Sequence, residues 1–77
     1  MPKIHTIGAI DIVIYFNEHG APHFHAIGPG YEAKIAIEDG ATIAGGLPGR
    51  ELRRVRRWVL ANQALLKNKW NEIALGI

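Results

Sequence analysis

The sequence contains no cysteine, so neither disulfide bonds nor thiolate metal ligands can stabilise the fold. It also lacks any run of about 18 apolar residues, the length that a membrane-spanning helix requires. The first residues, MPKIHTIGAID, contain neither the apolar segment nor the small-residue cleavage site of a signal peptide. We therefore expect a cytoplasmic protein without a membrane partner.

The 77 residues are enough for a single domain, which we place at 1–77. A domain of this size buries only roughly 60% of its unfolded surface and is marginally stable alone. The hydrophobic content of 48% is high enough for a true core. Surplus apolar surface would favour contact with a second copy, so we expect a homo-oligomer.

Charge is unevenly distributed along the chain. Residues 1–48 contain two basic and five acidic side chains, a net charge of −3, whereas residues 49–77 contain seven basic and two acidic side chains, a net charge of +5. Such asymmetry is found in proteins that bind nucleic acid, and it can equally attract two copies of one chain to each other.

The first half of the chain is predicted to form four strands. Ile10, Ile12, Ile14 and Phe16 alternate with polar or smaller residues, which indicates a strand whose Ile/Phe side faces inward. The other strands are expected at 23–27, 31–38 and 41–44. Gly28-Pro29-Gly30 and Asp39-Gly40 are typical of tight turns, and both central residues of the second turn are expected to adopt positive φ. The prediction is a four-stranded antiparallel meander.

The second half is predicted to be helical from Gly49 or Arg50 onward. Leu52, Val55 and Val59 form an apolar stripe at helical spacing, and the stripe resumes in a later set, namely Leu66, Trp70, Ile73 and Ile77. Asn62 interrupts it and is a favourable N-cap residue. We expect an α+β fold in which two C-terminal helices, or one helix bent near 61–63, pack on the Ile/Phe face of the sheet.

A histidine-rich segment, HGAPHFH, occupies residues 19–25. If Phe24 points into the core, alternation places His23 and His25 on the opposite sheet face. The neighbouring strands are expected to add three polar side chains to that face, namely Tyr15, Glu32 and Lys34.

Three interpretations of this histidine face are open. A metal site would use His23 and His25, with His19 or Glu32 as a third ligand. A general acid–base site would use the imidazoles, with the other polar side chains, Tyr15, Glu32 and Lys34, positioning a substrate. The third interpretation is structural: the side chains form hydrogen bonds within the fold or across a subunit interface.

The segment RELRRVRRW places four arginines on the helical face opposite the apolar stripe, namely Arg50, Arg53, Arg54 and Arg57. A solvated polar face is the commonest reason for such a pattern. The alternatives are neutralisation of nucleic-acid phosphates or pairing with an acidic protein surface.

Several short motifs resemble a bacterial family known as the domain of unknown function 4160 family: MPKI at 1–4, YFNEH at 15–19, PHFH at 22–25, YEAKI at 31–35 and LP at 47–48. Trp58, Leu65, Leu66 and Trp70 fit the helical pattern of the family, whereas Ala21 stands where proline is frequent. The resemblance implies a small bacterial protein, often encoded beside another small domain in toxin–antitoxin-like or mobile loci. It implies no established activity.

Together these observations favour an oligomeric protein–protein interaction module that needs no cofactor. One alternative is an enzyme that uses the His23/His25 face, either with a divalent metal or with the histidines alone. RNA is one substrate that such an enzyme could act on. The other is nucleic-acid binding through the arginine helix.

Overall fold

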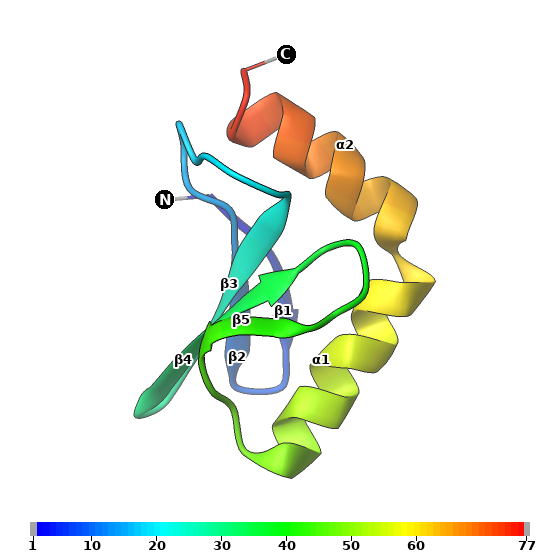
Figure 1. The fold of residues 1–77 in the computed structure, drawn as a ribbon. Helices are drawn as coiled ribbons and strands as arrows, with labels where there is room; N and C mark the ends of the chain where they lie inside the picture. The colour runs from blue at the N-terminus through cyan, green and yellow to red at the C-terminus, as the bar shows by residue number, and fades with distance from the viewer. Residues whose placement is uncertain (1, 77) are drawn as a thin grey trace.

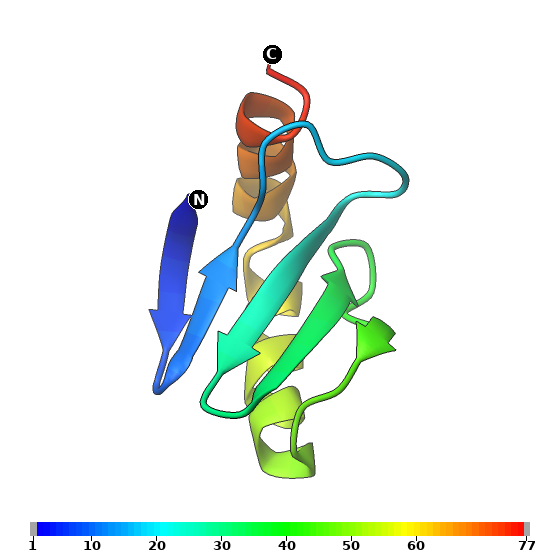
Figure 2. The same cartoon turned by 90° about the vertical axis from the view of Figure 1, so that its left-hand side faces the viewer.

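The computed structural model describes residues 2–76 as an antiparallel five-stranded sheet with two helices packed on one of its faces (Figure 1). The strands lie in chain order across the sheet, as Figure 2 shows. Their bounds are β1 Lys3–Ile7, β2 Ile10–Val13, β3 His23–Gly28, β4 Tyr31–Ala36 and β5 Thr42–Gly45, and the helices are α1 Gly49–Ala61 and α2 Gln63–Ile73. The α+β class and the antiparallel meander are confirmed. No helix within residues 2–76 is long and apolar enough to cross a membrane.

The predicted number of strands is wrong, because β1 precedes the four expected strands. β1 pairs with β2 through a two-residue turn, with Ile7 opposite Ile10. Gly8 has φ 59° and occupies the first turn position, where a type II′ turn requires a positive φ. The signal was weak, because the turn contains only one glycine and a register shift interrupts the alternation between Lys3 and His5.

The two predicted turns differ in how well they match expectation. Gly30, with φ 77°, closes the tight β3–β4 turn after Pro29. In the β4–β5 connection only Gly40 has positive φ, at 73°, so the prediction for Asp39 is wrong. Four residues, rather than the two expected, connect the paired residues Ala36 and Ala41. Within this longer turn, the Asp39 side chain accepts a hydrogen bond from the Ala41 backbone N–H at 2.9 Å.

The helices cover the predicted Ile/Phe face. The buried cluster combines side chains from the strands with others from the helices, namely Ile10, Ile12, Ile14, Phe24, Ala26, Ala33, Ile35, Ile37, Val55, Val59, Leu66, Trp70 and Ala74. Phe16 was expected in this core but is 65% exposed. Strand β2 ends at Val13, so the alternation that would bury Phe16 does not extend to it.

Two separate helices are confirmed, and Asn62 separates them. Its backbone N–H donates to Val59 and ends α1, while its carbonyl accepts from Leu66 in the first turn of α2. The prediction that its side chain caps α2 is wrong, because this side chain makes no capping hydrogen bond. It donates to the Trp58 carbonyl at 2.8 Å instead. The predicted stripe of α2 is buried at Leu66 and Trp70, while Ile77 lies outside the described residues.

The opposite face of the sheet carries no helix, as Figure 2 shows. In antiparallel pairs, residues directly opposite each other share a face. His25 pairs with Val13 on one side and with Lys34 on the other, so these three side chains lie together on the uncovered face. The fold thereby separates a helical layer from a polar sheet surface.

Candidate metal centre

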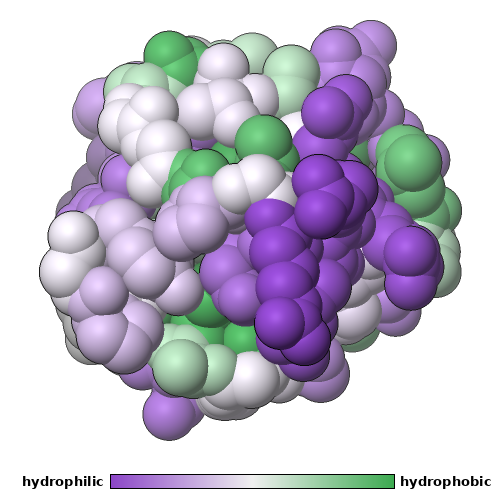
Figure 3. All heavy atoms as spheres, turned by 90° about the horizontal axis from the view of Figure 1, so that it is seen from below, coloured by the Kyte–Doolittle hydropathy of each residue, from purple (hydrophilic) through white to green (hydrophobic). Residues whose placement is uncertain are grey.

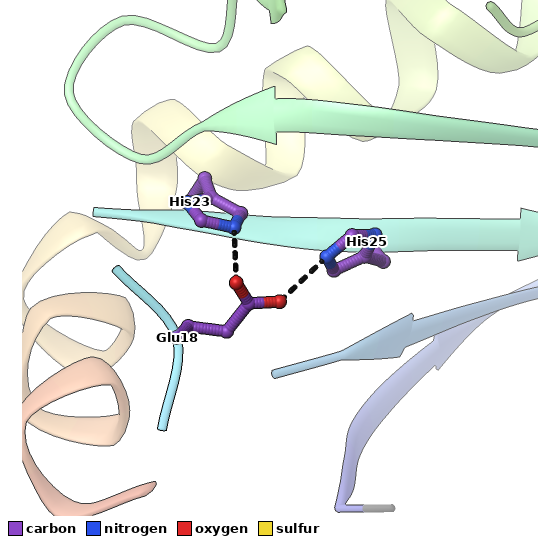
Figure 4. Close-up of side chains that lie close together, drawn as sticks. All are labelled: Glu18, His23 and His25. Atoms are coloured by element: carbon purple, nitrogen blue, oxygen red, sulfur yellow. Dashed lines mark hydrogen bonds and ion pairs between the residues drawn. The ribbon is translucent and has the colours of Figure 1, made fainter. Parts of the chain in front are cut away.

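The candidate site lies where β3 begins and where the loop between β2 and β3 passes over the uncovered sheet face (Figure 4). His23 and His25 point to the same side of β3 because one residue separates them. Their ring centroids are 5.5 Å apart. Glu18 comes from the loop and points its carboxylate between the two rings.

Glu18 contacts both histidines. Its Oε1 lies 3.0 Å from His25 Nε2, and its Oε2 lies 3.3 Å from His23 Nε2. One ring nitrogen of each histidine and one carboxylate oxygen of Glu18 all lie within 4.8 Å of one another. Ligands at about 2.0–2.1 Å around a tetrahedral zinc ion lie roughly 3.3 Å apart, so the 4.8 Å limit is wider than a zinc site and the side chains would close slightly around an ion.

His23 is buried, with only 1% of its surface exposed. The indole of Trp70 in α2 lies against it, with ring centroids 5.0 Å apart. Its Nδ1 lies 2.9 Å from the Ala21 carbonyl, which accepts a hydrogen bond when that nitrogen carries a proton, and Nε2 is the other ring nitrogen. That atom has no hydrogen-bond partner among the described residues and faces the Glu18 carboxylate.

His25 is held by contacts on three sides. Its Nε2 contacts Glu18, and its Nδ1 lies 3.3 Å from Oε2 of Glu32 on β4. Tyr15 packs edge-on against the ring, with centroids 4.6 Å apart. These contacts fix the ring so that Nε2 points toward His23 and Glu18.

All four ring nitrogens of the two histidines therefore face oxygen acceptors: one backbone carbonyl, both oxygens of Glu18 and one oxygen of Glu32. Two neutral imidazoles supply only two N–H groups. Two further positive charges would complete the pairing, either as two protons or as one divalent cation between the Nε2 atoms and Glu18. With the cation, each Nδ1–H keeps its outer acceptor, as is usual for histidine metal ligands.

Glu18 is kept ionised by its surroundings. Burial by itself raises the pKa of this carboxyl, but the hydrogen bond with His25 and the charges of His23, His25 and Lys34 outweigh it, so that the pKa lies below its ordinary value. The carboxylate form is the one that binds a cation.

A shallow depression of about 270 Å³ lies beside His25, over β4 and β5. Glu32 and Lys34 supply its charged side chains, and its floor consists of small residues, namely Ala33, Ala44 and Gly45. The depression gives a small molecule room on the Glu32 side of His25.

The structure brings most of the predicted site residues together around His25: His23, Tyr15, Glu32 and Lys34. His19 is exposed and lies outside the cluster. Glu18 takes its place, although sequence reasoning did not single it out. The YFNEH motif contains both residues, but only the path of the loop decides which one faces β3.

The predicted nucleic-acid residues lie on the other side of the molecule. Arg50, Arg53, Arg54 and Arg57 are all exposed on α1, whose buried side chains Val55 and Val59 face the sheet. Figure 3 shows hydrophilic side chains gathered at the end of the molecule where α1 begins. The sheet therefore separates the arginines from the depression beside His25.

One family model matches the chain, over residues 9–71, and it is described as a domain of unknown function (DUF4160). The match spans β2 to most of α2 and includes every residue of the candidate site. No curated protein and no solved structure matches the chain.

Proposed function

Since the chain belongs to the DUF4160 family of domains of unknown function, we propose from its own residues that it binds a divalent transition-metal ion through Glu18, His23 and His25. The observation that carries the proposal is the buried Nε2 of His23, which has no hydrogen-bond partner among the described residues. Buried polar atoms are nearly always paired, and each exception calls for an explanation such as an ion. A cation between His23 Nε2 and the Glu18 carboxylate would give this nitrogen a partner.

The donor set indicates the kind of metal. Two imidazoles and one carboxylate suit zinc and ferrous iron, whereas calcium and magnesium prefer oxygen ligands alone. Three protein ligands also leave at least one coordination position open, as in catalytic rather than structural zinc sites. A metal ion held by these three residues would supply an activated water near neutral pH, so we place the chemistry in the class of metal-assisted hydrolysis.

The residues around the ligands fit this role. Glu32 contacts Nδ1 of His25, and this carboxylate–histidine–metal arrangement orients a ligand and increases its basicity. Glu32 is also about half exposed and lines the depression together with Lys34. A small substrate there would have a cationic group beside it for an anionic substituent.

The test is a metal titration of purified, chelator-treated protein. We expect one equivalent of Zn²⁺ to bind by calorimetry, and one equivalent of Co²⁺ to give the visible absorption of a low-coordinate site. Glu18→Ala and His25→Ala should each weaken binding by about 10–100-fold or more, since ligands and their supporting groups have effects of this size. His19→Ala is the matched control, because this exposed histidine lies one residue from Glu18 and outside the cluster.

Two results would contradict the proposal. One is wild-type protein that binds neither ion at micromolar concentration. The other is binding that survives Glu18→Ala and His25→Ala but disappears with His19→Ala, which would locate the ion elsewhere.

Self-association is a second candidate property, supported by apolar side chains left outside the core. Leu60 on α1 and Leu65 on α2 are 61% and 45% exposed on either side of the helix junction. Sedimentation at micromolar concentration should reveal a dimer or larger oligomer that Leu60→Ser together with Leu65→Ser dissociates. A stable wild-type monomer would refute this idea, and with it the oligomeric partner role that the toxin–antitoxin-like resemblance implies.

A further inference from the structure

Helix α1 carries five arginines in its 13 residues, and all five are exposed. Four of them lie on the side that faces away from the core, namely Arg50, Arg53, Arg54 and Arg57. At 1.5 Å per residue, the first and last of these are separated by about 10 Å along the helix axis. The result is a continuous cationic face without a large apolar side chain among the four.

The arginines have little charge compensation within the chain. Arg54 contacts Glu51 at 3.4 Å, and this is the only ion pair of α1 within residues 2–76. Arg53 instead has arginines three and four residues after it, at Arg56 and Arg57. Like charges at these spacings destabilise a helix, so the arrangement is unfavourable for α1 on its own.

The position of the arginines along α1 adds to this cost. The N-terminal end of a helix carries partial positive charge and disfavours cations, which stabilise a helix near its C-terminal end. Arg50, Arg53 and Arg54 lie in the first six residues of α1, whereas its last turn contains no basic residue. A helix selected for stability alone would carry its arginines near its C-terminal end. The observed positions are therefore better explained by an anionic partner outside the chain.

We infer that this arginine face binds the phosphate backbone of a nucleic-acid duplex. Each strand of a duplex carries one phosphate per about 3.4 Å of its axis, so a face about 10 Å long spans roughly three phosphates of one strand. The guanidinium group matches phosphate geometry with two parallel hydrogen bonds. Protein interfaces, in contrast, have an apolar centre, which this face lacks.

The binding expected here reads the backbone and not the bases. Trp70 is buried in the core, and Trp58 is covered by His5, which stacks on it at 4.8 Å with nearly parallel rings. Neither indole is free to stack on an unpaired base, which single-strand recognition requires. This surface also lies across the sheet from the candidate metal centre, so the inference does not depend on metal binding.

The experiment measures fluorescence anisotropy of labelled 20-base-pair DNA and RNA duplexes of random sequence with the full chain at 50–200 mM salt. Wild-type protein should bind, and its affinity should fall steeply with salt. The double variant Arg53→Gln/Arg57→Gln should bind about tenfold more weakly at the lowest salt, and its slope of log affinity against log salt should decrease by about two.

The matched control is the double variant Lys67→Gln/Lys69→Gln on α2, which removes the same charge away from the arginine face. It should retain most of the affinity and slope. The arginine variant should also melt at the same or a higher temperature than wild type, because it relieves like-charge repulsion. A loss of binding therefore cannot come from unfolding.

Three results would overturn the inference. Wild type that does not bind either duplex would refute it directly. If the arginine and lysine variants bound the duplex equally weakly, the loss of affinity would follow from net charge and not from the arginine face. Binding to polyglutamate but not to duplexes would assign the face to an acidic protein.

Discussion

Metal binding at Glu18, His23 and His25 should weaken as the pH falls, because a metal ion and protons compete for the same imidazole nitrogens. The metal requires both Nε2 atoms without protons, and each of these atoms lies beside an oxygen of Glu18, which would accept a hydrogen bond from a proton there. Protons and the metal therefore compete for the same two atoms.

The size of the effect follows from the number of competing protons. Each proton that must leave lowers the apparent affinity by up to tenfold per pH unit, which is about 1.4 kcal/mol. Two imidazoles give up to 100-fold, or about 2.7 kcal/mol, per pH unit on the acid side. Glu18 adds nothing above about pH 5, because its pKa lies below the ordinary value of 4.5 and the carboxylate is already formed.

Calorimetric Zn²⁺ titrations between about pH 5 and pH 7, repeated in buffers of different ionisation enthalpy, measure both the affinity and the protons released. We expect metal binding to release protons on the acid side, in a number that declines as the pH rises. In His25→Ala the number should fall by one. An affinity that does not change with pH, with no proton release, would refute the assignment of both Nε2 atoms as ligands.

Three further predictions concern the stability of the metal-free fold. Wild type should be more stable than Glu18→Gln above pH 4.5, and this difference in the free energy of unfolding should disappear as the pH falls through the lowered pKa of Glu18. Urea unfolding of both proteins at a series of acidic pH values measures the difference. A difference that grows as the pH falls would contradict the prediction. Leu66→Ala should cost about 2–5 kcal/mol in urea unfolding, because it opens a cavity in the core, whereas the half-exposed Leu65→Ala should cost less than about 1 kcal/mol; equal costs would show that α2 packs differently. Gly45→Ala should cost at least about 1–3 kcal/mol, because φ is 68° and the new methyl would overlap a backbone carbonyl of β4, while Gly46→Ala meets open space and should unfold within about 1 kcal/mol of wild type.

Local patterns predicted much of the fold. Alternation in β2 and β4 and the helical spacing of Val55 and Val59 placed these side chains in the core correctly, because burial on one face imposes a period. Alternation failed at Phe16, where the chain leaves the sheet. It also could not reveal β1, whose pairing with β2 depends on a turn with a weak sequence signal.

The candidate site was only partly predictable, for a physical reason. The direction of His25 follows from strand geometry, but that of Glu18 follows from the loop, in which Asn17 and Gly20 have positive φ, at 59° and 88°. Side-chain directions in such a loop have no fixed period, so the sequence could not distinguish Glu18 from its neighbour His19. The burial of His23 depends on Trp70, which is 47 positions away in the sequence and reaches it only in the folded chain.

Anomalous diffraction from crystals of the zinc-loaded protein would show whether the buried Nε2 of His23 is a metal ligand. We expect one strong zinc peak per chain, about 2.0–2.1 Å from Nε2 of His23 and of His25 and about 2.0–2.2 Å from a Glu18 oxygen. A zinc peak at His19 or His5 with none at His23, or an ordered water in place of the metal at full zinc loading, would contradict it.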